Sequence, residues 1–155
     1  MRKPLVFCLL VLAGPAAGLA RAASEYGSVI GGNEPKSIIV VSDHATAKER
    51  DAAHILQYGI HQMTGIRVPI QRDAGWESTG RNLIISVGDT RYLISSVRNA
   101  LKAKGAASAA GRPVYALHKA ARRLYLVGGD ETGTLFAVYD FLKSCGKHWP
   151  EGEAV

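Results

Sequence analysis

The sequence predicts an α/β (α+β) domain, a mixed β-sheet with helices packed on it, in the order β-α-β-β-α-β-β-α. Runs of β-branched residues without alternation, such as residues 37–42 and 83–87, are typical of strands covered on both faces. Apolar residues at steps of three and four indicate amphipathic helices between them. The 155 residues, 47% hydrophobic and 21% charged, are too few for a (β/α)8 barrel, which needs about 250.

The strand over residues 37–42 leads into the first predicted helix. Thr46 and Glu49 have capping-box spacing, so the helix should begin after Thr46. One apolar stripe follows, and Gly65 provides a left-handed end. The stripe comprises Ala52, Ile55, Leu56, Gly59, Ile60 and Met63. A short strand over residues 68–70 is expected at a sheet edge, because Pro69 has no amide hydrogen.

The strand over residues 83–87 ends at Gly88, and Asp89 or Thr90 is expected to cap the next helix. That helix is predicted from Leu93, Val97 and Leu101 at steps of four, with Ile94 beside them. The alanine-rich stretch 105–111 is expected to be a connector.

Two β-prone runs, 114–118 and 124–127, predict a hairpin with a basic turn over residues 119–123. A glycine-rich turn, 128–133, then opens the last helix. Leu135, Val138, Leu142 and Cys145 lie on one stripe of that helix, which is expected to end at Gly146.

Residues 1–22 have the form of a secretory signal peptide: a basic start, an apolar run and small residues. We therefore expect an exported chain, periplasmic or extracellular, without stable membrane insertion after cleavage. Residues 23–36 are interpreted as a flexible leader. Removing Arg2, Lys3 and Arg21 takes the 19 basic residues to 16 against 13 acidic ones, a net charge of +3 instead of +6. The remaining basic residues are scattered, so nucleic acid is not an expected partner.

For several motifs that could carry chemistry, a purely structural role is the better explanation. The turn at 128–133 lacks a phosphate-binding spacing, and its acids suit a helix N-terminus. Cys145 and His148 are three residues apart, but Cys145 continues a buried stripe. A metal could be held by one face of the first helix, yet that face lies opposite the apolar stripe and is expected to be solvated. Its residues are Asp51, His54, Tyr58 and His61. We assign no catalytic, cofactor or metal residues.

Two stretches carry a family resemblance. Residues 52–58, then 63–65 and 68–70, resemble the helix, "T-G" stop and "l-P-i" strand of the domain before the catalytic barrel in alpha-glucuronidases and beta-N-acetylhexosaminidases. Residues 133–142, followed by Gly146 and Trp149–Pro150, resemble the "G-T-l-y-a-v-y-d-f-L…G…W…P" helix and exit of that domain. The resemblance covers residues 37–150 and implies a hexosaminidase domain-2-like fold.

The resemblance implies a non-catalytic accessory domain of a secreted glycoside hydrolase, acting in polysaccharide metabolism. In that family the barrel supplies the catalytic acids, so residues 151–155 are expected to begin a linker to a barrel absent from this chain. The alternative is a free-standing carbohydrate-binding or interaction module. Trp149, Pro150 and Trp76 are the candidate barrel-interface or sugar contacts, and Tyr92 is a further aromatic that could stack on a sugar.

Overall fold

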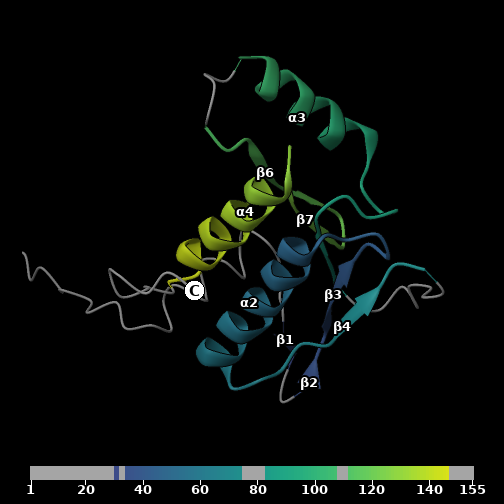
Figure 1. Cartoon of the computed structure of the whole chain (residues 1–155). Coiled ribbons are helices and arrows are strands. Elements are labelled where there is room, and N and C mark those ends of the chain that lie inside the picture. The colour runs from purple at the N-terminus through teal and green to yellow at the C-terminus, as the bar shows by residue number, and fades with distance from the viewer. Residues whose placement is uncertain (1–29, 32–33, 75–82, 108–111, 147–155) are drawn as a thin grey trace, which may run out of the picture.

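A computed structural model describes residues 30–31, 34–74, 83–107 and 112–146 of the chain (Figure 1). Its elements follow the predicted order, after a small extra hairpin. The strands are β1 (Ile30–Gly31), β2 (Glu34–Pro35), β3 (Ser37–Val41), β4 (Ile70–Arg72), β5 (Leu83–Val87), β6 (Tyr115–Ala120) and β7 (Arg123–Gly128). The helices are α2 (Ala47–Thr64), α3 (Ser95–Ala107) and α4 (Glu131–Ser144).

The sheet is mixed, as predicted, with strand order β4-β3-β5-β7-β6. β4, β3, β5 and β7 run parallel to one another, and β6 pairs antiparallel with β7. β1 and β2 form a separate antiparallel pair inside the segment expected as a leader. The fold class predicted from the sequence is therefore confirmed.

Helices cover both faces of the sheet. α2 and α4 lie side by side on the face turned toward the viewer in Figure 1, over the main core, which includes Ile39, Ile85 and Leu126. α3 packs on the other face, where Val97 and Leu101 contact Tyr125 and Val127 of β7. Alternate residues of the same strand thus serve two cores, which explains why the strand sequences are apolar throughout.

The first predicted helix has the expected boundaries. Thr46 and Glu49 make both capping-box bonds, and Gly65 takes the left-handed conformation with φ of 74°. The short strand after it begins two residues later than predicted, at Ile70. Pro69 cannot donate to the sheet, although its carbonyl accepts from the Ile39 amide at 2.9 Å. β4 is an edge strand, as expected.

The expected cap of α3 is wrong. Neither Asp89 nor Thr90 caps it, because α3 begins only at Ser95. Thr90 instead hydrogen-bonds the Ser86 hydroxyl at 2.6 Å, and Asp89 forms an ion pair with Arg98. The helix also continues through Gly105 to Ala107, into the stretch expected as a connector.

The hairpin has a shorter turn than predicted. Lys119 pairs with Leu124 and Ala120 with Arg123, so only two residues form the turn, and Ala121 has φ of 49°. In α4, Asp130 caps the helix and accepts from the Gly133 amide at 2.6 Å. A Cβ at Gly128 would lie 2.2 Å from the Thr134 nitrogen, so this turn requires glycine.

Candidate binding cleft at the carboxyl ends of the strands

The chain leaves two neighbouring parallel strands in opposite directions. From β3 it passes through α2 to β4 on one side, and from β5 through α3 toward β6 and β7 on the other. Because α2 and α3 cover opposite faces, the loops after β3 and β5 diverge and leave room between them. In open α/β sheets this topological switch point is the usual place for a ligand.

A cavity of about 410 Å³ lies at this point, and we call it the switch-point cleft. Three loops and α3 supply its walls: the loops follow β3, β4 and β5. Its lining residues are Ser42, Asp43, His44, Asp73, Ala74, Asp89, Thr90, Arg91 and Arg98. A volume of this size falls in the range of small-molecule sites, roughly 300–1,000 Å³.

Asp73 ties the three loops together. Its carboxylate accepts from the Asp43 amide at 3.0 Å and from the Arg91 amide at 2.8 Å, while its own amide donates to the Val41 carbonyl. Only 7% of the residue is exposed. A buried carboxylate is stable here because backbone donors satisfy it, and it fixes the relative positions of the loops.

The loop after β5 is fixed by two further contacts. The buried Ser86 and Thr90 hydroxyls bond each other, and the Thr90 hydroxyl accepts from the Tyr92 amide at 3.3 Å. Gly88 has φ of 76°, and a Cβ there would lie 2.5 Å from the Glu49 carboxylate. Glycine is thus favoured where β5 turns into the cleft, because side-chain-bearing residues rarely adopt this φ.

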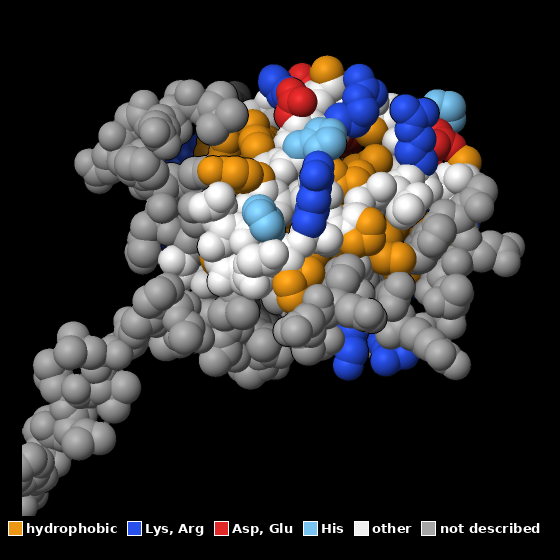
Figure 2. Space-filling model, turned by 90° about the horizontal axis from the view of Figure 1, so that it is seen from below, with side chains coloured by type: hydrophobic (Ala, Val, Ile, Leu, Met, Phe, Trp, Pro, Cys, Tyr) orange, Lys and Arg blue, Asp and Glu red, His pale blue; other side chains and the backbone are white. Residues whose placement is uncertain are grey.

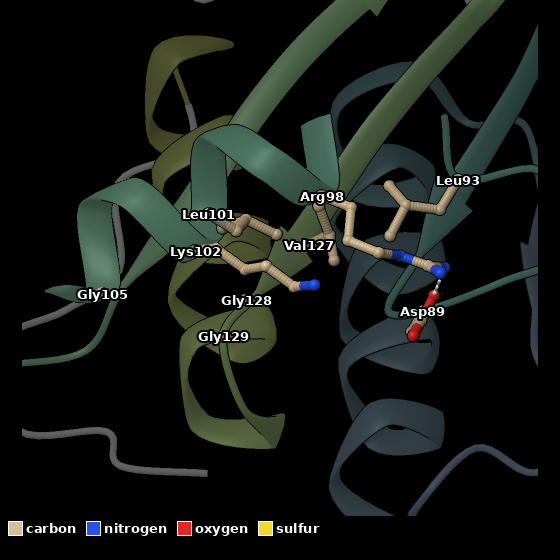
Figure 3. A pocket seen from close by; sticks show the side chains of 9 residues that line it. All are labelled: Asp89, Leu93, Arg98, Leu101, Lys102, Gly105, Val127, Gly128 and Gly129. Atoms are coloured by element: carbon tan, nitrogen blue, oxygen red, sulfur yellow. Dashed lines mark hydrogen bonds and ion pairs between the residues drawn. The ribbon is translucent and has the colours of Figure 1, made fainter. Parts of the chain in front are cut away.

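An ion pair divides the switch-point cleft from a second cavity. Arg98 of α3 contacts the Asp89 carboxylate at 2.6 Å, and both residues line both cavities. The second cavity, about 380 Å³, lies between α3 and the end of β7 (Figure 3). There the Lys102 side chain extends toward Gly128 and Gly129 (Figure 3). Both members of the pair are largely exposed, so it separates the cavities more than it stabilises the fold.

The structure leaves most of the sequence-predicted contacts untested. Trp76, Trp149 and Pro150 lie outside the described residues, as does His148. Tyr92 is half-buried beside Ile38, Val40 and Ile84. The guanidinium groups of Arg91 and Arg123 lie 5.0 and 5.4 Å from its ring centre. Both cations therefore contact the Tyr92 ring in this structure, and stacking of Tyr92 on a sugar stays a prediction.

The possible metal-binding face of α2 is exposed along its length, at Asp51, His54, Tyr58 and His61. Within residues 30–31, 34–74, 83–107 and 112–146, no three His, Cys, Asp or Glu side chains come together as ligands. Cys145 is buried in the main core, as its stripe predicts. Burial raises the pKa of its thiol to about 11, so the reactive thiolate is scarce at neutral pH.

Charge is dispersed among the described side chains on the face shown in Figure 2. Figure 2 shows the described Lys and Arg side chains mostly standing apart, interspersed with hydrophobic and histidine side chains. This face has no continuous basic field of the kind that follows a nucleic-acid backbone. None of the described helices is both long and apolar enough to cross a membrane.

No family model matches this chain, and no curated protein is similar enough to count as its relative.

Sequence reasoning missed the cleft residues Asp43, His44 and Asp73. Each lies within three residues of the end of a parallel strand. That position was the available signal, since such ends meet at one edge of the sheet. The sequence predicts that this strand ends at Ile70, whereas β4 ends at Arg72 and Asp73 follows it directly.

Proposed function

We propose that this chain is a non-catalytic accessory domain of a secreted, carbohydrate-active protein of the glycoside hydrolase type. It packs against a catalytic barrel domain and contributes no catalytic acid of its own. The fold supports this proposal, because a mixed sheet covered by helices is the architecture that the motif resemblance implies.

The observation that carries the proposal is a set of apolar side chains left exposed or half-buried on the two-helix layer, which we call the helix-layer strip. Its most exposed members are Tyr58 on α2 and Phe136 on α4, which are 54% and 45% exposed. Half-buried apolar residues continue it at helical spacing: Ile55, Leu135 and Tyr139. Large aromatic side chains left exposed on one helix layer are consistent with a face that meets another domain.

The two helices are held together closely enough to act as one docking surface. A Cβ at Gly59 would lie 2.7 Å from the Leu142 side chain, so the helices approach at glycine. At their N-terminal ends, Lys48 contacts the Glu131 carboxylate at 3.1 Å and the Thr132 hydroxyl at 3.3 Å. This contact lowers the pKa of the Glu131 carboxyl below its usual value.

Association with a barrel domain tests the proposal. The DNA next to the gene is read for a barrel-coding sequence, the barrel is expressed, and its affinity for the full chain is measured by calorimetry. We expect the double variant Tyr58→Ser, Phe136→Ser to weaken binding at least tenfold, since large aromatic side chains dominate interfaces. Lys102→Ser is the matched control, an exposed position on the helix of the opposite face.

Activity provides the second test. The full chain should hydrolyse none of a panel of chromogenic glucuronides and N-acetylhexosaminides, because glycoside hydrolysis needs two carboxyl groups placed across the scissile bond. Among the described residues of the switch-point cleft, Asp73 is bonded to backbone amides and Asp89 is paired with Arg98, which leaves Asp43 without a second carboxylate to act with it. Turnover that disappears on substitution of one Asp or Glu would overturn the accessory-domain proposal, as would failure of a neighbouring barrel to bind.

The second candidate function, a carbohydrate-binding module, is favoured by the polar switch-point cleft.

A further inference from the structure

We propose that the switch-point cleft binds a neutral saccharide, with the Asp43 carboxylate and the His44 imidazole making hydrogen bonds to its hydroxyl groups. The choice of a saccharide among neutral polyols rests on the proposed carbohydrate context. The cleft itself and its polarity do not depend on that context.

The cleft is built before any ligand arrives. The buried Asp73 carboxylate fixes the loops after β3 and β5 through the Asp43 and Arg91 amides. The Ser86–Thr90 bond fixes the second of these loops against its own strand. Loops held in this way need little ordering when a ligand binds, so more of the contact energy remains as affinity.

Two side chains at the cleft have hydrogen-bonding capacity to offer. Among the described residues, neither the Asp43 carboxylate nor the His44 imidazole makes a hydrogen bond or an ion pair, although the backbone amides of both are bonded. Asp43 is half-buried and His44 is exposed, and both line the cavity. A carboxylate accepts and an imidazole can donate, which together match a hydroxyl group that does both.

The charges around the cleft disfavour an anionic ligand. The Arg98 guanidinium neutralises Asp89, and the Asp73 carboxylate is turned to backbone amides. The lining comprises three carboxylates and two guanidinium groups, which together carry a net charge of −1. Phosphate or a carboxylate would face the Asp43 charge, and the Arg91 guanidinium is already held against Tyr92. A sugar hydroxyl instead donates to the Asp43 carboxylate.

Affinity should be modest. No aromatic ring is among the described residues that line the cleft, so the apolar face of a sugar gains no stacking contact there. We therefore expect a dissociation constant on the order of 1 mM, which weak polar recognition of a small ligand gives.

The experiment measures binding of methyl glycosides of neutral monosaccharides and disaccharides to the full chain, by saturation-transfer NMR and calorimetry up to tens of millimolar. Inorganic phosphate is the competing probe. We expect at least one saccharide to bind, Asp43→Asn to weaken it at least tenfold, and His44→Ala to weaken it about threefold. The matched controls Asp51→Asn and His54→Ala, on the outer face of α2, should change affinity less than twofold.

Three results would overturn the proposal: no saccharide binds, phosphate binds the chain while no saccharide does, or Asp43→Asn binds the saccharide as tightly as the unsubstituted chain. Urea unfolding checks that Asp43→Asn is folded, and if it is not, His44→Ala decides, because His44 is exposed and its imidazole holds no described contact. Barrel association is measured on different residues, Tyr58 and Phe136. Failure of barrel association therefore leaves the saccharide proposal intact, and failure of saccharide binding leaves the barrel proposal intact.

Discussion

Replacing Asp73 by alanine should destabilise the domain by about 3 kcal/mol. The carboxylate accepts two backbone amides, and hydrogen bonds to a charged group contribute roughly 1.5–3 kcal/mol each. We take the lower end for both bonds, because water can reach the amides once the side chain is removed. Asp73→Asn keeps one acceptor oxygen and should cost about half as much.

Urea unfolding, followed by circular dichroism, measures the change as a shift of midpoint at constant slope. Asp51→Asn, at an exposed position on α2, is the control and should stay within about 0.5 kcal/mol of the unsubstituted chain. A loss below about 0.5 kcal/mol in Asp73→Ala would refute the reasoning, because the loops would then be held by other contacts. Saccharide binding should also fall in Asp73→Ala, since the cleft walls lose their common anchor.

Further predictions concern Cys145 in the core and two glycines. Cys145, whose pKa burial raises to about 11 from 9.0, should react with a thiol reagent at pH 8 at least tenfold more slowly in the native chain than in urea. Labelling of the native chain at the unfolded rate would contradict the burial of this thiol. The contribution of Cys145 to the free energy of unfolding should be complete below pH 9 and decline as pH rises through 11, because the thiol ionises at lower pH in the unfolded chain. Gly128→Ala should cost about 3 kcal/mol or more in urea unfolding, since its Cβ would lie 2.2 Å from the Thr134 nitrogen. Gly105→Ala, in open space within α3, should instead stabilise the chain by roughly 0.5–1 kcal/mol, and a loss there would show that helix propensity does not govern the site.

Local signals in the sequence were enough to predict most of the elements. Thr46 and Glu49 lie three residues apart and bond each other, so spacing alone locates the start of α2. The same holds for the stripe that buries Cys145. The predicted boundaries of β4 and α3 differ from the structure because they depend on contacts with other strands. Pro69 accepts a hydrogen bond from Ile39 of β3, and the Thr90 hydroxyl bonds that of Ser86 in β5.

The switch-point cleft could not be predicted from local sequence signals either, because it depends on contacts between residues far apart in the chain. The Asp73 carboxylate bonds residues 30 and 18 positions away, so nothing in its immediate neighbourhood distinguishes it from a solvated loop acid. Arg98 and Asp89 are nine residues apart, with a turn and the start of a helix between them. Periodicity predicts which face of an element is buried, but it carries no information about which loops meet at the end of a sheet.

The pairing of α2 with α4 has a consequence for how the domain folds. These helices lie at opposite ends of the described chain, and Lys48 meets Thr132 across 84 positions. Such distant contacts are formed late and at high entropic cost, so folding should be slow for the size of the domain. α4 also supplies Val138, Phe141 and Leu142 to the main core. A fragment that stops before α4 should therefore not form a smaller stable unit, and the domain should gain or lose its structure in a single cooperative step.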